Sequence, residues 1–132
     1  TIEDDPSAGI EIYDYYDVEE VEVNEDPIPF AIVEQKPKFN GGDANEFSRW
    51  VNKRLVYPQI CVENGVQGRV TLSFTVMPDG SLSNISVLRG VDKELDKEAL
   101  RVVSSSPRWE PGRQRDRAVP VTYTFPVVFS LR

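Results

Sequence analysis

Histidine is absent from this chain of 132 residues, and cysteine occurs once, as Cys61. Without histidine the chain lacks the commonest general base and metal ligand, which excludes hydrolases built on Ser/His/Asp or Cys/His groups. A single cysteine excludes an intramolecular disulfide. No apolar run approaches the roughly 20 residues of a membrane-spanning helix, and no signal peptide begins at Thr1. We therefore expect either a cytosolic protein or a module whose N-terminal anchor precedes Thr1.

Basic residues are missing from the first quarter of the chain. Residues 1–33 hold eleven acidic residues and no basic one, whereas residues 34–132 hold eleven acidic and fifteen basic residues, so the net charge of −7 divides into −11 and +4. Like charge of this density opposes collapse, which predicts an acidic linker over residues 1–33, mostly extended or flexible, and one domain over residues 34–132. Valine and tyrosine also give the linker β-propensity, and residues 18–24 are a candidate strand for a sheet edge.

Two main helices are predicted from their caps and apolar spacing. Asp43 followed by Glu46 forms a capping box ahead of a helix over about residues 44–56. Asp92 caps a second helix, which stops at Ser104.

A short helix is predicted between them, from Pro58 to the αL-tolerant pair Asn64 and Gly65. Cys61 falls inside this helix. Because no histidine or metal cluster is available to activate its thiol, we interpret it as a buried packing residue.

Three segments alternate apolar and polar side chains, as half-buried strands do. Residues 69–77 lead into a hairpin turn at residues 78–80, and a bulge near Ser83 or Asn84 is needed to switch the faces of the return strand. The longest alternation covers residues 118–131. The sequence therefore predicts an α+β fold, with two main helices packed on one face of a three-stranded antiparallel sheet. Trp50, Phe74 and Trp109 lie on apolar stripes and are expected to be largely buried.

The last predicted strand contains Pro120 and Pro126, which places it at a sheet edge because proline has no N–H for a ladder. Neighbouring residues of a strand direct their backbone groups to opposite sides. We expect odd-numbered residues to pair with residues 69–77 and even-numbered residues to face outward. The outward N–H donors for an added peptide are then Thr122, Thr124, Val128 and Ser130, with a gap at Pro126.

Two other classes of function find weaker support. Four arginines between residues 108 and 117 are compatible with nucleic-acid binding, but no aromatic motif accompanies them and the chain is net acidic. An exposed loop or a contact with an acidic partner is favoured. The carboxylates of residues 92–98 alternate with lysines, which is typical of a solvated ion-pair face. We predict no enzymatic activity, no metal, no cofactor and no nucleic-acid partner.

The segment YPQICVENGVQGRVTLSFTVMPDGSL, a following helix that contains Ala99, and WEPG at residues 109–112 resemble the C-terminal domain of TonB energy-transducing proteins. The resemblance covers about residues 43–131, and the upstream VEQKPKFNGG is similar to the lead-in of Bacteroidetes-type members. It implies a periplasmic module, tethered to the inner membrane, that engages the TonB box of outer-membrane transporters by strand addition. Energy would come from proton-channel proteins of the inner membrane, through an N-terminal anchor.

The resemblance also implies a partner contact just before and at the Tyr-Pro pair, that is, at Arg54, Tyr57 and Pro58. A helix end decorated with cations that favour its dipole explains Arg54 equally well. Two alternatives keep the fold but change the role. In the first the domain ends a membrane sensor or peptidase, and in the second it serves as a TolA-like structural tether.

Overall fold

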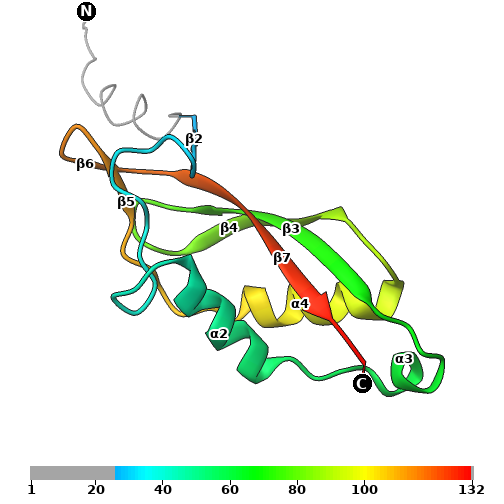
Figure 1. Cartoon of the computed structure of the whole chain (residues 1–132). Helices are drawn as coiled ribbons and strands as arrows, with labels where there is room; N and C mark the ends of the chain where they lie inside the picture. The colour runs from blue at the N-terminus through cyan, green and yellow to red at the C-terminus, as the bar shows by residue number, and fades with distance from the viewer. Residues whose placement is uncertain (1–25, 132) are drawn as a thin grey trace, which may run out of the picture.

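The computed structural model describes residues 26–131, and the predicted strand at residues 18–24 lies outside them. A four-stranded sheet in the order β2-β7-β3-β4 lies over α2 and α4 (Figure 1). This confirms the predicted α+β class with two main helices on one face; β3, β4 and β7 are the three antiparallel strands, and β2 adds a fourth, parallel one. The elements are β2 (Ile28–Pro29), α2 (Ala44–Arg54), α3 (Gln59–Glu63), β3 (Gly68–Val76), β4 (Leu82–Arg89), α4 (Lys93–Ser104), β5 (Gly112–Gln114), β6 (Arg117–Val119) and β7 (Val121–Phe129).

Both main helices begin at the predicted caps. The Asp43 carboxylate accepts from the N–H of Asn45 at 3.0 Å, and the Asp92 carboxylate accepts from the N–H of Glu94 at 2.9 Å. Each bond satisfies one of the backbone donors that a helix start leaves without a partner. Helix α2 ends at Arg54, two residues earlier than predicted, because Leu55 is already extended.

The short helix α3 forms as predicted, with Pro58 at its N-cap. Cys61 is 2% exposed, and burial raises the pKa of its thiol. Its Sγ lies 3.5 Å from Oδ2 of Asp92. The interpretation of Cys61 as a packing residue is confirmed, since a raised pKa disfavours the reactive thiolate.

The β3–β4 hairpin contains the expected bulge. Ser73 pairs with Ser86 but Thr75 pairs with Ser83, so two residues of β4 lie opposite one of β3. Asn84 takes a positive φ of 52° at this point. The bulge turns Ile85 toward the core side, which explains the change of face in the sequence pattern.

The predicted strand over residues 118–131 is in fact two strands that separate at Pro120. Residues before it form β6, which pairs with β5 in a separate two-stranded sheet. Residues after it form β7, which runs antiparallel to β3 from Val121 opposite Val76 to Phe129 opposite Gly68. The arginine-rich loop between residues 113 and 117 is thus a tight hairpin instead of an open loop.

Aromatic rings fill the space between the sheet and the helices. Phe74 is fully buried and Trp109 is 3% exposed, as expected. Trp50 is less buried than these two and packs at the margin of the core: its indole stacks on Phe47 with 5.8 Å between centroids. Phe39 lies at the centre of the cluster although its segment reads as turn material.

Candidate partner-binding site

The outward edge of β7 begins beneath β2. The N–H of Ile28 donates to the Pro120 carbonyl and the N–H of Phe30 donates to the Thr122 carbonyl, both at 2.9 Å. Even-numbered backbone groups of β7 therefore face away from β3, as the parity of the prolines predicted. β2 runs parallel to β7, with Pro29 opposite Thr122.

This arrangement corrects one expectation about the edge. Thr122 belongs to the outward row, but β2 already occupies its backbone, so the edge is not open there. Beyond Thr122, within residues 26–131, no strand lies on the outward side of β7. The open part of the row consists of Thr124, Val128 and Ser130, whose side chains are all exposed, with the Pro126 gap between the first two.

Strand β2 itself was not predicted from the sequence, because Pro27 and Pro29 argue against a strand there. Both prolines are odd-numbered in a strand whose even-numbered N–H groups, on Ile28 and Phe30, point to β7. No ladder donor is lost, so a parallel edge strand tolerates them. The alternation of Ile28 and Phe30 with proline was the available signal.

Side chains on either side of β2 fix it to the sheet. The rings of Phe30 and Tyr123 lie 4.4 Å apart, and burial raises the pKa of the Tyr123 phenol. Val33 is 3% exposed in a small cluster with Val119 and Val121. Its neighbour Gln35 exchanges two backbone hydrogen bonds with Arg113. The segment that carries β2 is therefore part of the folded body.

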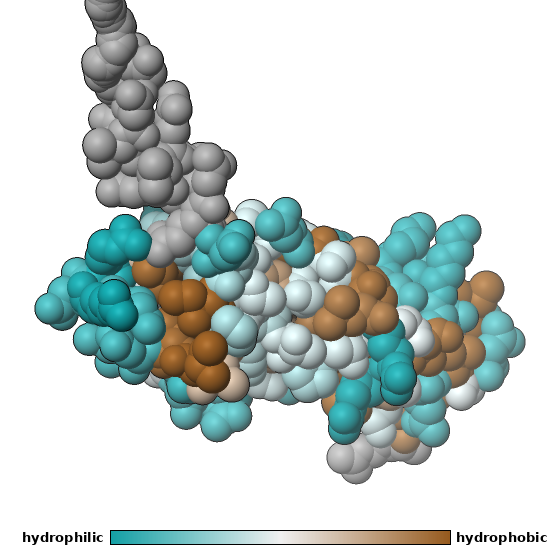
Figure 2. Space-filling model, turned by 90° about the horizontal axis from the view of Figure 1, so that it is seen from above, coloured by the Kyte–Doolittle hydropathy of each residue, from teal (hydrophilic) through white to brown (hydrophobic). Residues whose placement is uncertain are grey.

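A cavity of about 550 Å³ lies where β2 ends and the open edge begins. In Figure 2, the view from above, one apolar patch lies at the end of the molecule where β2 lies, and weakly polar side chains separate it from further apolar patches toward the opposite end. The residues that line the cavity are Pro27, Pro29, Phe30, Ala31, Thr122, Tyr123 and Thr124.

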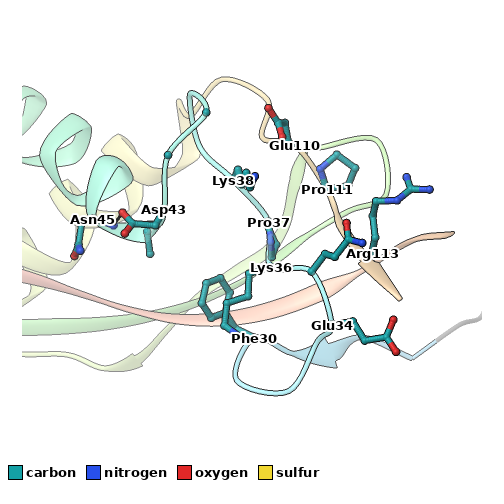
Figure 3. A pocket seen from close by; sticks show the side chains of 14 residues that line it. Phe30, Glu34, Lys36, Pro37, Lys38, Asp43, Asn45, Glu110, Pro111 and Arg113 are labelled. Atoms are coloured by element: carbon teal, nitrogen blue, oxygen red, sulfur yellow. Dashed lines mark hydrogen bonds between the residues drawn. The ribbon is translucent and has the colours of Figure 1, made fainter. Parts of the chain in front are cut away.

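A second cavity of about 820 Å³ lies between residues 34–38, the start of α2 and residues 110–113 (Figure 3). Its charged side chains are balanced in sign, three acidic and three basic: Glu34, Asp43 and Glu110, and Lys36, Lys38 and Arg113. In the described part of the chain no group of histidine, cysteine or carboxylate side chains has the arrangement of a metal site. The lining therefore favours no particular class of ligand.

The predicted contact residues Arg54, Tyr57 and Pro58 lie together at the other end of the domain. The Arg54 guanidinium covers the Trp50 ring at 4.3 Å and donates to the Trp50 carbonyl at 3.4 Å. The Tyr57 hydroxyl donates to the Val66 carbonyl, and its ring meets Phe129 edge-on. Tyr57 thus has a structural role in joining this corner to β7, while Arg54 is exposed at the end of α2.

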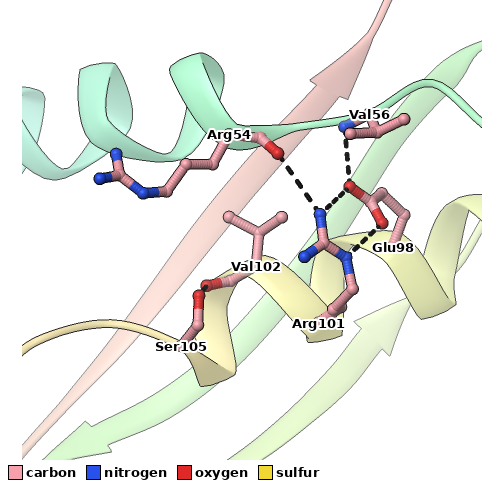
Figure 4. A network of polar contacts seen from close by, with 6 residues as sticks. All are labelled: Arg54, Val56, Glu98, Arg101, Val102 and Ser105. Atoms are coloured by element: carbon pink, nitrogen blue, oxygen red, sulfur yellow. Dashed lines mark hydrogen bonds and ion pairs between the residues drawn. The ribbon is translucent and has the colours of Figure 1, made fainter.

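A carboxylate network holds the same corner to α4 (Figure 4). Glu98 accepts the N–H of Val56 at 2.7 Å and two guanidinium bonds from Arg101 at 2.7 and 2.8 Å. Arg101 also donates to the Arg54 carbonyl, whereas the Arg54 guanidinium points away from the network. The pKa of Glu98 lies below its ordinary value of 4.5, chiefly because of the hydrogen bonds from Arg101. The Val56 N–H and the positive charge of Arg101 lower it further, while burial acts in the opposite direction.

We expect Glu98→Gln to lower the free energy of unfolding by about 1 kcal/mol at pH 7, since charged hydrogen bonds are lost but the exposed Arg101 is screened by solvent. A carboxyl whose pKa is lowered in the folded state stabilises the fold at pH values above its ordinary pKa. This stabilisation is lost as the pH falls through the lowered pKa of the folded state. The difference from wild type in urea unfolding should therefore shrink at pH 3.

Glu94→Gln, on the same helix, is the matched control. Its side chain accepts no hydrogen bond within the described residues and lies in the first turn of α4, so the variant should lose only the small helix-dipole contribution and less stability than Glu98→Gln. An equal and pH-independent loss in both variants would contradict the role given to Glu98.

No helix among residues 26–131 is long and apolar enough to cross a membrane. The family model described as Gram-negative bacterial TonB protein C-terminal matches residues 53–131. Among curated relatives, the protein TonB of Helicobacter pylori strain 26695 is 27% identical over 99 residues, which are 71% of this chain and 33% of that protein. The protein TonB of Pseudomonas aeruginosa is 34% identical over 56 residues, 42% of this chain and 16% of that protein.

The chain thus spans a third or less of the length of these relatives. Two NMR solution structures of the Helicobacter pylori TonB C-terminal domain are similar in fold, each with a TM-score of 0.52. One is 26% identical and the alignment covers 71% of this chain and 89% of that one. The other is 23% identical, with 66% and 91% covered.

Proposed function

Because the chain belongs to the family of TonB C-terminal domains, we propose that it is a periplasmic binding module that engages the TonB box of outer-membrane transporters by strand addition. In this role it transmits energy from a proton-driven complex of the inner membrane and has no catalytic activity of its own. Its partners are an outer-membrane TonB-dependent transporter and, through an N-terminal anchor, inner-membrane proton-channel proteins.

One observation carries this proposal: the outward backbone groups of β7 at Thr124 and Val128 face no strand of the described chain. An exposed edge of this kind is a liability for aggregation unless a partner uses it. An extended peptide that adds to the edge gains main-chain hydrogen bonds, and side-chain contacts select its sequence. Pro126 limits the ladder by removing one donor, so the proposed interaction is short and releasable.

The contacts of β2 bear on the domain boundary. β2 lies within the range of residues 1–33 that the charge pattern assigns to a linker, yet it pairs with β7. We propose that the binding domain extends upstream of residue 34 to include β2, and that the acidic residues before it form the linker to the membrane anchor.

The proposal is tested by titrating the chain with a purified TonB-dependent transporter from the same organism. A synthetic peptide with the sequence of that transporter's box should compete for the same site. Binding that the peptide does not displace would contradict strand addition. If the chain binds no transporter at all, the alternatives of a TolA-like tether or of the terminal domain of a membrane sensor or peptidase are favoured.

Arg54 provides a separate test of the proposed contact at the α2 end. Arg54→Glu should weaken transporter binding about fivefold if its guanidinium meets the transporter, beyond the loss of roughly 1 kcal/mol in stability from the helix dipole and the Trp50 ring. Lys53→Glu changes the same charge in the same helical turn and is the matched control. If both variants bind like wild type and only their melting temperatures fall, Arg54 serves the helix and not the partner.

A further inference from the structure

The junction between β2 and the open edge has a defined geometry. After Phe30 the chain turns away from β7, and the N–H groups of Ile32 and Val33 donate back to the Pro29 carbonyl at 3.1 and 3.2 Å. β2 therefore stops at Thr122, and the next outward donor on β7 is the N–H of Thr124. An extended peptide on the open edge continues the line of β2 and begins beside Phe30.

β2 is held too firmly to be a simple competitor for this edge. Its two backbone bonds are reinforced by the Phe30 and Tyr123 rings and by the buried Val33. Downstream, Lys38 exchanges backbone bonds of 3.0 and 2.8 Å with Glu110. Displacement of β2 would break its two backbone bonds and separate the Phe30 and Tyr123 rings before a ligand gained any contact.

We propose that β2 stays in place when a peptide binds, and that the cavity at its end recognises an apolar side chain at the end of the peptide that adjoins Phe30. This inference rests on the proposed strand addition and specifies its ligand: a short extended peptide with a terminal leucine, valine or phenylalanine.

Two features of the site support this specificity. The walls at the junction are carbon-rich, from Phe30, Ala31, Pro29 and Tyr123, so an apolar side chain that enters loses contact with water. The open edge from Thr124 to Ser130 covers six residue steps, about 20 Å at the rise of a strand, which suits a peptide of about seven residues. With one donor missing at Pro126, the end contact then fixes the register.

The first experiment uses capped heptapeptides of alternating valine and threonine, with Leu, Phe, Ala or Ser placed at one end or the other. Wild type should bind the Leu and Phe peptides about tenfold more tightly than the Ser peptide, for one end only. Ala31→Phe places a ring in the lining of the cavity, which obstructs entry beside Phe30, and should abolish this preference. Ile32→Phe is the matched control, because Ile32 is 69% exposed in the same turn and does not line the cavity.

The outcomes separate this inference from the proposed function. If the heptapeptides bind wild type but show no end preference, or if the preference survives Ala31→Phe, recognition by the cavity is wrong while strand addition stands. If neither they nor a transporter's box peptide bind, strand addition itself is wrong.

The second experiment locks β2 with a disulfide between Ile28→Cys and Val121→Cys, which are direct partners in the parallel register and do not line the cavity. Cys61 is buried and should not interfere. Oxidised and reduced forms should bind the Leu peptide with affinities within twofold. A tenfold loss of affinity on oxidation would show that β2 leaves the edge when the peptide binds. This would overturn the proposal that the peptide adds to the edge beside β2. Should the bond not form, Pro29→Cys with Thr122→Cys tests the same point at the other paired position.

Discussion

Replacement of Trp109 by alanine is expected to lower the free energy of unfolding by about 3–5 kcal/mol. The indole is 3% exposed and lies 4.9 Å from the Phe47 ring and 5.4 Å from the Phe39 ring, centroid to centroid. Its Nε1 donates to Oγ of Ser106 at 3.2 Å. These rings also pack on each other, and Phe47 packs on Phe74 and Phe125 of the sheet, so the cavity left by truncation has little scope to collapse.

Trp50→Ala is the internal comparison. Trp50 stacks on the same Phe47 ring but is only partly buried, so its truncation should cost clearly less. Urea unfolding followed by far-ultraviolet circular dichroism measures both losses without relying on tryptophan fluorescence. If Trp109→Ala cost no more than Trp50→Ala, the core would not be centred where the aromatic contacts place it.

Trp109 also links the core to the hairpin turn. Its N–H donates to the Gly80 carbonyl at 2.8 Å, and a Cβ added at Gly80 would lie 2.1 Å from the Trp109 carbonyl oxygen. With a φ of +89°, this position suits glycine both by conformation and by space. The segment that follows α4 is thus packed against the β3–β4 turn before the chain enters β5.

Local patterns were sufficient for most of the fold. Caps at Asp43 and Asp92 set the helix starts, and the change of parity between Leu82 and Ile85 required the bulge that Asn84 provides. These features depend on residues a few positions apart, which a sequence displays directly. The division of the last predicted strand at Pro120 could be predicted only in part. Proline indicates a break in a strand, but it does not indicate that the residues before it pair with β5.

The site was predictable in one respect and hidden in another. The parity of two prolines fixed which row of β7 faces outward, because a missing donor is tolerated only where no partner strand lies. That β2 covers the start of this row depends on a parallel pairing between Ile28 and Val121, which are far apart in sequence. A strand of two residues, one of them Pro29, at the border of an acidic segment has no periodicity long enough to be recognised.

Thr124→Pro is expected to weaken binding of a box peptide about 30-fold or more while leaving the fold intact. The substitution removes the first free donor of the open edge and leaves a carbonyl of the peptide without its partner, which together cost about 2–3 kcal/mol. The fold should tolerate the change because Pro126 already occupies an outward position on the same strand. Thr124 is exposed and its side chain contributes little to the core.

Two further variants isolate the donor as the cause. Thr124→Val keeps the N–H and removes only the hydroxyl, so its affinity should stay within about twofold of wild type. Pro126→Ala supplies the missing donor in the middle of the row and should strengthen binding several-fold, since a ladder bond is worth about 0.5–1.5 kcal/mol. The affinities, measured by calorimetry with one peptide, should therefore rank Pro126→Ala above wild type and Thr124→Pro last. Wild-type affinity in Thr124→Pro, with the melting temperature unchanged, would place the peptide elsewhere than on the outward row of β7.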